Sequence, residues 1–361
     1  MPSSKNSVII ACAGSGKTTR LVNDAIAASD KRIAIVTYTN NNAREITRRF
    51  DELNSGVPNY VEVMTWFGFL LRECVRPFQR SKYDKKRIQS LLFVNQMSAR
   101  GSKETDTERH YLFNGDMIYS DKIAKFAVKC EEASSNAVTS RLGQIYTDLY
   151  FDEFQDLAGW DLEVIEMLLQ SGIRTTLVGD PRQHIYSTHP SNKNSQYLGI
   201  KLLDLLSIWN KNQLCVLEPM SNTHRCNELI CEFANRLWPN MEAMSSLHNE
   251  TTEHDGVFLV ASTIAKQYIQ HFKPQVLRYD KRANDYGANA LNFGLSKGLQ
   301  FDRVLVVPTG PIKKYLASGD LVHLNKSKDK LHVAITRARH SVAFVYDGPS
   351  TIISNRWPQT N

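Results

Sequence analysis

The chain has 361 residues, of which 42% are hydrophobic, so it can bury a sizeable core and is long enough for two. No apolar run approaches the roughly 18 residues of a membrane span, and the N-terminal residues lack the layout of a signal peptide. We therefore expect a cytoplasmic protein with no membrane partner. The net charge of +7 is compatible with a polyanionic partner, but mildly basic soluble proteins are common.

The six cysteines are scattered without a CxxC pair, which indicates reduced thiols rather than a disulfide framework. The ten histidines are scattered as well, and no His/Cys group has the spacing of zinc ligands. The sequence therefore predicts no structural metal.

A phosphate-binding loop is predicted at "ACAGSGKTT", residues 11–19. The apolar run "SVII" before it is typical of a buried parallel strand, and residues 17–28 have helical spacing, which is the context such a loop requires. Ala11 stands where the usual pattern has its first glycine, a departure that the site tolerates if the backbone there is ordinary. The backbone N–H groups and the Lys17 ammonium would face the phosphates. The expected nucleotide contacts are Ala13, Gly14, Ser15, Gly16, Lys17, Thr18 and Thr19.

An acidic pair follows a second apolar run in "QIYTDLYFDEFQD", residues 144–156. Asp152, at the end of the predicted strand, would hold Mg²⁺ together with the Thr18 hydroxyl. Glu153 would take a proton from the water that attacks the terminal phosphate. The pattern therefore predicts hydrolysis of ATP with Mg²⁺ as cofactor.

Further motifs resemble those of superfamily 1A helicases, the UvrD/Rep/PcrA group. They occur in the order seen in that family and span nearly the whole chain: 35–46, 63–70, 152–156, 177–187, 223–227, 295–304 and 333–339. The resemblance implies that Gln183 senses the γ-phosphate and that Arg225 and Arg337 reach the same phosphate from a second domain. It also places His224 against the base, and Gly298 and Gln300 near the nucleotide.

The resemblance also implies contacts with single-stranded DNA, with RNA not excluded. Translocases of this kind stack bases on aromatic side chains and hold the backbone through polar groups. Buried tyrosines beside a strand are the standing alternative. The candidates are Thr37, Tyr38, Asn40, Thr65, Trp66 and Tyr186.

Three departures from the family pattern limit what the resemblance implies. Thr188 occupies the place of a base-stacking tryptophan, and no glutamine precedes the phosphate loop to recognise adenine. The large duplex-engaging insertion is also missing, because only residues 281–289 separate two predicted strands at 274–280 and 290–296.

The predicted architecture is α/β, with two RecA-like P-loop NTPase domains built on parallel sheets and a small helical insertion in the first. The first domain is expected at residues 1–78 and 144–205. The insertion is expected at 79–143, with helices at 86–97 and 121–133. The second domain is expected at 206–361, with strands within 257–262, 275–279, 303–309 and 341–347.

The leading functional hypothesis is an ATP-dependent translocase and helicase on single-stranded DNA, with 3′ to 5′ polarity taken from the resemblance alone. The alternative is a nucleic-acid-stimulated ATPase subunit of a larger complex, for example beside a nuclease partner in antiviral defence. A third hypothesis, a nucleotide-binding protein without turnover, fits poorly with the intact set of Lys17, Asp152, Glu153, Arg225 and Arg337.

Overall fold

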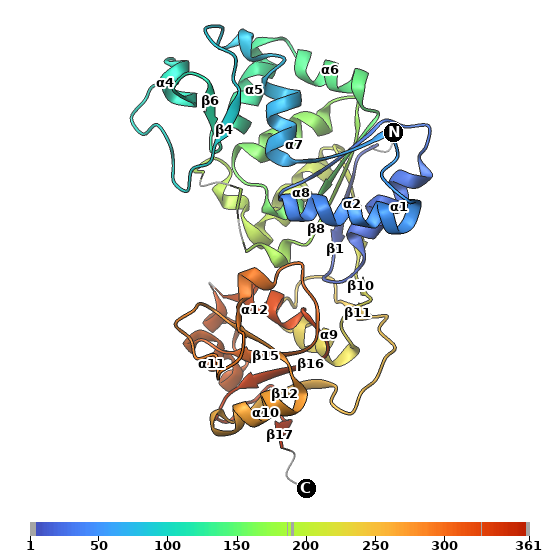
Figure 1. Ribbon diagram of the computed structural model, residues 1–361, viewed down its shortest axis with the longest axis vertical. Coiled ribbons are helices and arrows are strands. Elements are labelled where there is room, and N and C mark those ends of the chain that lie inside the picture. The colour runs from blue at the N-terminus through green and yellow to red at the C-terminus, as the bar shows by residue number, and fades with distance from the viewer. Residues whose placement is uncertain (1–4, 186, 189–190, 326, 359–361) are drawn as a thin grey trace. The chain divides into compact units, whose positions relative to one another are not determined.

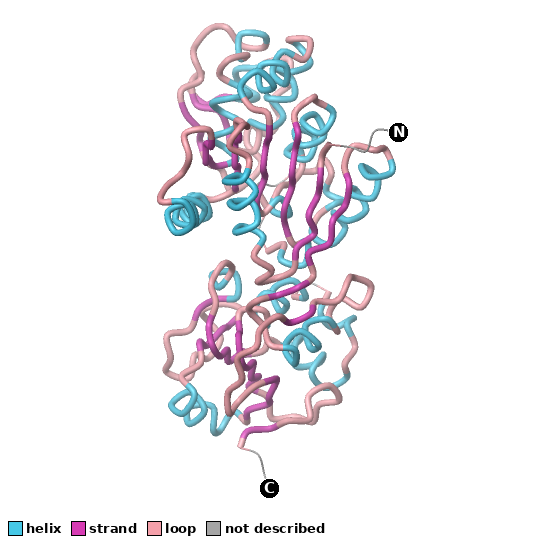
Figure 2. Tube along the Cα trace, turned by 90° about the vertical axis from the view of Figure 1, so that its right-hand side faces the viewer, coloured by secondary structure: helices cyan, strands magenta, loops and turns pink. Residues whose placement is uncertain are grey.

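The computed structural model describes residues 5–185, 187–188, 191–325 and 327–358. The described part of the chain divides into two compact units (Figure 1). Unit 1 comprises the residues up to Ile10 and Lys17–Glu218, and unit 2 comprises Ala11–Gly16 and the residues from Pro219 onward. Each unit has a sheet, magenta in Figure 2, with helices around it.

The sheet of unit 1 has the strand order β3-β2-β7-β8-β1-β9. The pairs β1–β8, β2–β3, β2–β7 and β7–β8 are all parallel. Every residue of β2 and of β7 is buried, as expected for central strands covered on both faces. The strands are β1 (Ser7–Ala11), β2 (Ile33–Thr37), β3 (Val61–Thr65), β7 (Asp148–Asp152), β8 (Arg174–Gly179) and β9 (Val216–Met220).

The helices of unit 1 include the predicted one after the phosphate loop, which is confirmed as α1. Thr39 caps α2 by accepting a hydrogen bond from Asn42 N, and a π-helical stretch, Leu70–Val75, continues α3. The helices are α1 (Lys17–Ala27), α2 (Asn40–Asn54), α3 (Trp66–Phe69), α4 (Thr107–Tyr111), α5 (Ile123–Ala133), α6 (Ala137–Ile145), α7 (Trp160–Gln170) and α8 (Leu202–Lys211).

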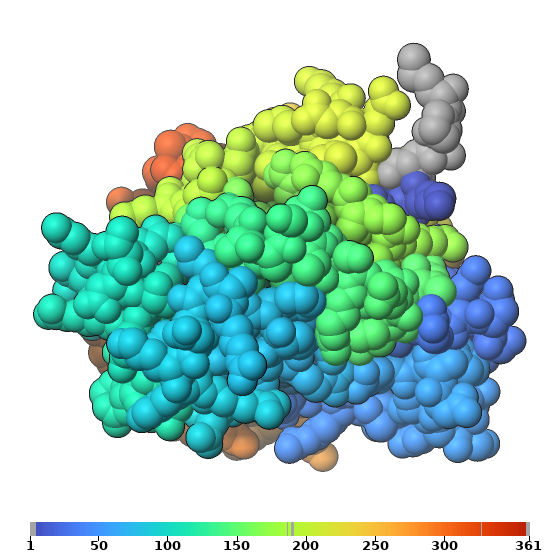
Figure 3. Space-filling model, turned by 90° about the horizontal axis from the view of Figure 1, so that it is seen from above, coloured from blue at the N-terminus to red at the C-terminus, as the bar shows by residue number. Residues whose placement is uncertain are grey.

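The insertion is mixed rather than helical. It contains a small sheet of β4 (Ser90–Leu92), β6 (Met117–Tyr119) and β5 (Leu112–Phe113), in that spatial order. The predicted helix at 86–97 is wrong, because the backbone there bonds to other segments: Gln89 N donates to Asp116 O at 2.8 Å, and Leu92 O accepts from Ser120 N at 3.0 Å. The predicted helix at 121–133 is confirmed as α5. In Figure 3 the insertion (teal) is continuous with the surface of the residues just before it (light blue).

The sheet of unit 2 has the order β14-β13-β15-β16-β12-β17, and its paired strands are parallel. A separate parallel pair joins β10 (Asn222–Thr223) and β11 (Ser245–Ser246). The remaining elements are β12 (Gly256–Val260), β13 (Gln275–Arg278), β14 (Leu291–Asn292), β15 (Phe301–Val307), β16 (Ala338–Val345), β17 (Arg356–Trp357), α9 (Glu228–Asn235), α10 (Ala265–Phe272), α11 (Gly310–Ser318) and α12 (Lys328–Ile335).

The strands expected within 257–262, 275–279, 303–309 and 341–347 are confirmed as β12, β13, β15 and β16. The strand expected at 290–296 is only β14, because Phe293–Ser296 form a 3-10 turn in which Ser296 Oγ donates to Phe293 O at 2.8 Å. Residues 279–290, between β13 and β14, form turns and irregular backbone.

The expected boundary at residue 205 falls inside α8. Leu205, Leu206 and Trp209 of this helix are buried in the core of unit 1, and Trp209 Nε1 donates to Glu166 Oε2 at 3.1 Å. Unit 1 therefore continues to Glu218. Among the described residues, no helix is both long and apolar enough to cross a membrane.

Candidate nucleotide and nucleic-acid sites

The phosphate loop connects β1 to α1. Ala11 is the last residue of β1, fully buried, and its φ is not positive, so this position does not need a glycine. The left-handed conformation occurs instead at Gly14 (φ 73°) and Gly16 (φ 81°), where glycine is the residue that adopts it at least cost. Lys17 opens α1, so the loop delivers its N–H groups and the helix N-terminus to one place.

The acidic pair at the end of β7 meets the start of α1. Thr18 Oγ1 donates to Asp152 Oδ2 at 3.0 Å, and Lys17 Nζ lies 2.7 Å from Glu153 Oε1. Glu153 has a φ of 57°, and its backbone N–H donates to Asp152 Oδ1 at 3.0 Å. The structure thus brings together four residues that the sequence assigned to one site from two distant segments.

The charges in this cluster shift each other's protonation. Burial lowers the pKa of Lys17, but Glu153 and Asp152 outweigh burial and the net shift is upward, so the ammonium is retained. Burial, and then repulsion from Glu153, raise the pKa of Asp152 to about 6, against the opposing effects of Lys17 and Thr18. The adjoining oxygens of Thr18 and Asp152 are hard ligands of the kind that Mg²⁺ prefers, so they fit this cofactor.

Gln183, after β8, joins the cluster through a hydrogen-bonded chain. Its Nε2 donates to Asp180 Oδ2 at 2.8 Å, Asp180 N donates to Gln155 Oε1 at 3.0 Å, and Gln155 Nε2 donates to Glu153 Oε2. A Cβ on Gly179 would lie 2.2 Å from Gln155 Oε1, so only glycine permits this approach. Gln155 and Asp180 are thus positioning residues that the sequence did not single out, although both lie inside the motifs at 152–156 and 177–187.

The two predicted arginines lie together in unit 2. Arg225 Nη1 donates to Thr336 O at 3.1 Å, while Arg337 Nε donates to Val333 O at 3.1 Å and Arg337 Nη1 to Leu299 O at 3.2 Å. Arg337 is 2% exposed. The bond to Leu299 places Arg337 beside the turn that holds two further predicted contacts, Gly298 (φ 85°) and the exposed Gln300.

Unit 2 also contains residues 11–16 of the phosphate loop. His224 N donates to Gly14 O at 2.9 Å, and a Cβ on Gly14 would lie 2.6 Å from Arg225 Cβ. Gly14 therefore permits a close backbone approach in addition to its positive φ. The His224 side chain is exposed.

The strand-contact candidates follow β2 and β3 in unit 1. Thr37 is buried, Tyr38 is half-buried, Asn40 opens α2 and Thr65 caps α3 by accepting from Gly68 N at 3.2 Å. Asn40 and Thr65 line adjoining shallow grooves that contain four arginines, of which Arg48 is paired with Glu45 and Glu52 and Arg72 with Glu62 and Glu73. The grooves are also lined by Ala43, Arg44, Thr47, Arg48, Asp51, Val63, Met64, Gly68, Leu71, Arg72 and Arg76.

Trp66 is not at this surface. Its side chain is 1% exposed and its Nε1 donates to Asp161 Oδ1 at 2.9 Å. Thr188, at the place of the missing tryptophan, is also buried and donates to the other oxygen of Asp161. The prediction of Trp66 as a strand contact is therefore corrected to a core position. Tyr186 lies outside the described residues.

Phe93 is a surface aromatic that the sequence did not reveal. It is 69% exposed, its ring stands edge-on to Phe67 at 5.3 Å, and Phe67 lies 6.0 Å from the ring of Tyr38. An aromatic residue in a segment mistaken for an amphipathic helix gives no signal of exposure.

Comparison with known proteins decides the family. A family model described as an AAA domain matches residues 2–189, just over half of the chain. The chain belongs to this AAA domain family. AAA domains bind and hydrolyse ATP, so ATP is the nucleotide and the chain is an ATP-hydrolysing enzyme. No curated protein matches it.

Two solved structures of arterivirus nonstructural protein 10, a helicase, are similar in fold to the AAA-domain chain. The first covers 95% of this chain at 15% identity with a TM-score of 0.48. The second, a complex with DNA, covers 97% at 13% identity with a TM-score of 0.51. This chain spans only 60% and 62% of those two chains. The predicted fold, α/β with two RecA-like domains on parallel sheets, is confirmed by the second likeness and by the parallel pairing in both sheets.

Proposed function

We propose that this AAA-domain chain is a superfamily 1 motor that moves along single-stranded DNA in the 3′ to 5′ direction, driven by ATP. One observation carries the proposal. The acidic pair that follows β7 and the arginine-lined grooves that follow β2 and β3 lie at the carboxyl edge of one parallel sheet. A change at the nucleotide can therefore reach the grooves through adjacent strand ends.

In the proposed reaction, Glu153 accepts a proton from the attacking water, and Gln183 positions Glu153 through Asp180 and Gln155. Lys17 holds the phosphates. Arg225 and Arg337 would neutralise the charge that spreads over the phosphoryl oxygens as the bond breaks.

The remaining nucleotide contacts serve binding. The backbone of residues 13–19 would cradle the phosphates, His224 would lie against the base, and the turn with Gly298 and Gln300 would contact the ribose side. Mg²⁺, held by Thr18 and Asp152, would neutralise phosphate charge when bound.

The proposed strand track uses the polar groups of Asn40 and Thr65 for the backbone and Tyr38 for stacking, while Thr37, 1% exposed, is corrected to a core position like Trp66. Phe93 adds a stacking face that compensates for Thr188. The arginines along the grooves supply the sequence-independent attraction to phosphates. The DNA complex of the similar arterivirus helicase supports a nucleic-acid partner.

The experiment that tests this function is steady-state ATP hydrolysis with single-stranded DNA, single-stranded RNA or blunt duplex DNA. We expect single-stranded DNA to stimulate turnover at least about tenfold, and Lys17→Ala to abolish turnover under every condition. Stimulation by RNA alone would change the substrate class. Turnover that no nucleic acid alters would contradict a motor function.

A second candidate is a nucleic-acid-stimulated ATPase subunit that works beside a partner such as a nuclease in antiviral defence. The short 279–290 segment favours it, because turns there offer no domain to engage a duplex. We expect the chain alone to unwind a forked duplex weakly. Processive unwinding by the isolated chain would favour the self-sufficient helicase instead.

A further inference from the structure

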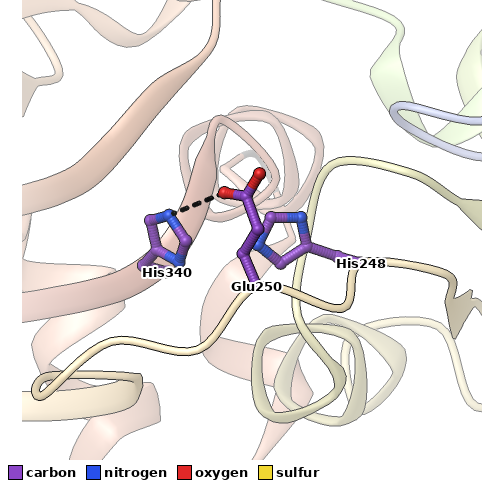
Figure 4. A group of neighbouring side chains, drawn as sticks. All are labelled: His248, Glu250 and His340. Carbon is purple, nitrogen blue, oxygen red and sulfur yellow. Dashed lines mark ion pairs between the residues drawn. The ribbon is translucent and has the colours of Figure 1, made fainter.

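Three side chains of unit 2 converge without a role in the proposed reaction. His248 and Glu250 lie in the loop between β11 and β12, and His340 lies on β16 (Figure 4). One ligand atom from each lies within 4.8 Å of the others. His340 Nε2 is 3.8 Å from Glu250 Oε2, and the two imidazole rings are 5.0 Å apart.

The histidines have unusual surroundings for a purely structural cluster. His248 Nε2 is buried and has no hydrogen-bond partner among residues 5–185, 187–188, 191–325 and 327–358. The His340 side chain is 6% exposed, and its Nδ1 lies 3.7 Å from Asp255 Oδ1. A buried imidazole nitrogen without a hydrogen-bond partner is destabilising, so it calls for a ligand. A carboxylate behind the second nitrogen is the usual arrangement for a metal-binding histidine.

The local charge suits a cation. Glu250, Asp255 and Asp302 provide three carboxylates, and Arg339 offsets one of them through contacts of 2.7 Å to Glu250 and 3.3 Å to Asp302. Arg339 contacts one oxygen of the Glu250 carboxylate, and the second oxygen is available as a ligand atom for a metal ion. With neutral imidazoles the net charge of these side chains is about two negative, which a divalent ion would balance.

We propose that His248, Glu250 and His340 bind one transition-metal ion of the Zn²⁺ class, with water as the fourth ligand. Two imidazoles and a carboxylate are ligands that such ions accept, whereas Mg²⁺ prefers oxygen alone. In a tetrahedral site with metal–ligand bonds of about 2.1 Å, the ligand atoms lie about 3.4 Å from one another. The three side chains must therefore move closer together when they bind the ion. Glu250 can do this by rotation, since its side chain is 65% exposed.

The ion would tie a loop to the segment that carries Arg225. Asn227 Nδ2 donates to His340 O at 2.7 Å, and Asn227 N donates to Arg339 O at 3.0 Å. At the start of the loop, Leu247 N donates to Thr223 O at 2.7 Å. Metal binding would therefore stabilise unit 2 around these contacts. The sequence predicted no structural metal because His340 is far from the other two ligands along the chain.

The test uses the full chain, freed of metal with a chelator, and Co²⁺ as the spectroscopic probe. We expect one equivalent of Co²⁺ to give the intense visible bands of a tetrahedral site, Zn²⁺ to displace it, and millimolar Mg²⁺ to leave the bands unchanged. His248→Ala and Glu250→Gln should each weaken Zn²⁺ binding at least about 100-fold, more than outer-shell changes usually do. Zn²⁺ should raise the melting temperature of the unchanged chain but not that of His248→Ala.

The control is His323→Ala, a histidine change outside the cluster, which should leave the Co²⁺ bands intact. Circular dichroism shows whether each variant is folded, and the two loop variants avoid removing the buried His340 ring. Absence of the bands in the folded unchanged chain, or bands that persist in folded His248→Ala, would overturn the proposal. Neither result bears on ATP hydrolysis, so the two proposals fail separately.

Discussion

Glu153 adopts a left-handed backbone conformation with φ of 57°, which costs a non-glycine residue about 1 kcal/mol or more. The conformation coincides with the ion pair to Lys17 and the hydrogen bond from Gln155. The surroundings thus hold the carboxylate in one place. That is the property a general base requires.

We predict that Glu153→Gln keeps ATP binding and lowers turnover about 10²- to 10⁴-fold, because an amide cannot accept the proton. Single-turnover hydrolysis and nucleotide binding should be measured together. Glu132→Gln, which removes a surface carboxylate paired with Lys129, is the matched control and should change neither. Unchanged turnover in Glu153→Gln would remove this residue as the base.

His254 predicts a pH dependence of stability. Its ring is stacked 3.9 Å from both Phe258 and Phe272, and its Nε2 lies 2.9 Å from Tyr268 Oη. Burial, and then the charge of Arg303, lower the pKa of His254 to about 4. The unfolded chain, with a pKa near 6.5, therefore binds the proton first as the pH falls. The stabilisation present above pH 6.5 is lost towards pH 4.

We expect this loss to amount to about 1–3 kcal/mol in the free energy of unfolding. His254→Phe should flatten that part of the profile in denaturant titrations between pH 7.5 and pH 4.5, whereas His323→Gln should leave it as it is. An identical slope for His254→Phe and the unchanged chain would show that other groups set the pH dependence.

At the scale of elements, the ends of β2 and β3 and the small sheet of the insertion form the proposed strand track. The aromatic rings of Tyr38, Phe67 and Phe93 are neighbours, and Phe93, just after β4, is the most exposed of the three. We predict that Phe93→Ala weakens single-stranded DNA binding about 5- to 100-fold, because base stacking is worth about 1–3 kcal/mol. The salt dependence of binding should stay the same, since no charge is removed.

Phe113→Ala is the matched control for Phe93→Ala, because Phe113 is another exposed aromatic of the insertion, in β5. Fluorescence anisotropy at several salt concentrations measures both variants. Equal affinity of Phe93→Ala and Phe113→Ala would exclude Phe93 from the track.

The sequence predicted the elements whose signal is local. β7, β15 and β16 each contain a short apolar run, at 149–151, 304–307 and 342–345, and the order of strand, loop and helix around Lys17 leaves little choice of conformation. The prediction of a helix at 86–97 was wrong because the apolar residues of this segment suit a helix. In the structure its backbone forms hydrogen bonds with the backbone of Asp116 and Ser120 instead. The prediction of Trp66 as a strand contact was wrong because its inward orientation depends on a hydrogen bond to Asp161, which is far away along the chain.

At the scale of the whole molecule, the account rests on coupling between ATP turnover and movement along a strand. The phosphate loop makes contacts within unit 2 through Gly14 and His224, while Lys17 and Thr18, which follow at once, belong to unit 1. The residues of the predicted phosphate loop are therefore divided between the two units along the chain. Turnover at this segment is the event we expect to drive movement.

The most direct test is stopped-flow translocation on single strands of increasing length that carry a fluorophore at one end. We predict that with ATP the lag before the signal grows linearly with length when the label is at the 5′ end, and not when it is at the 3′ end. Glu153→Gln should give no such lag. ATP turnover stimulated by the strand but without any dependence of the signal on length would contradict the account.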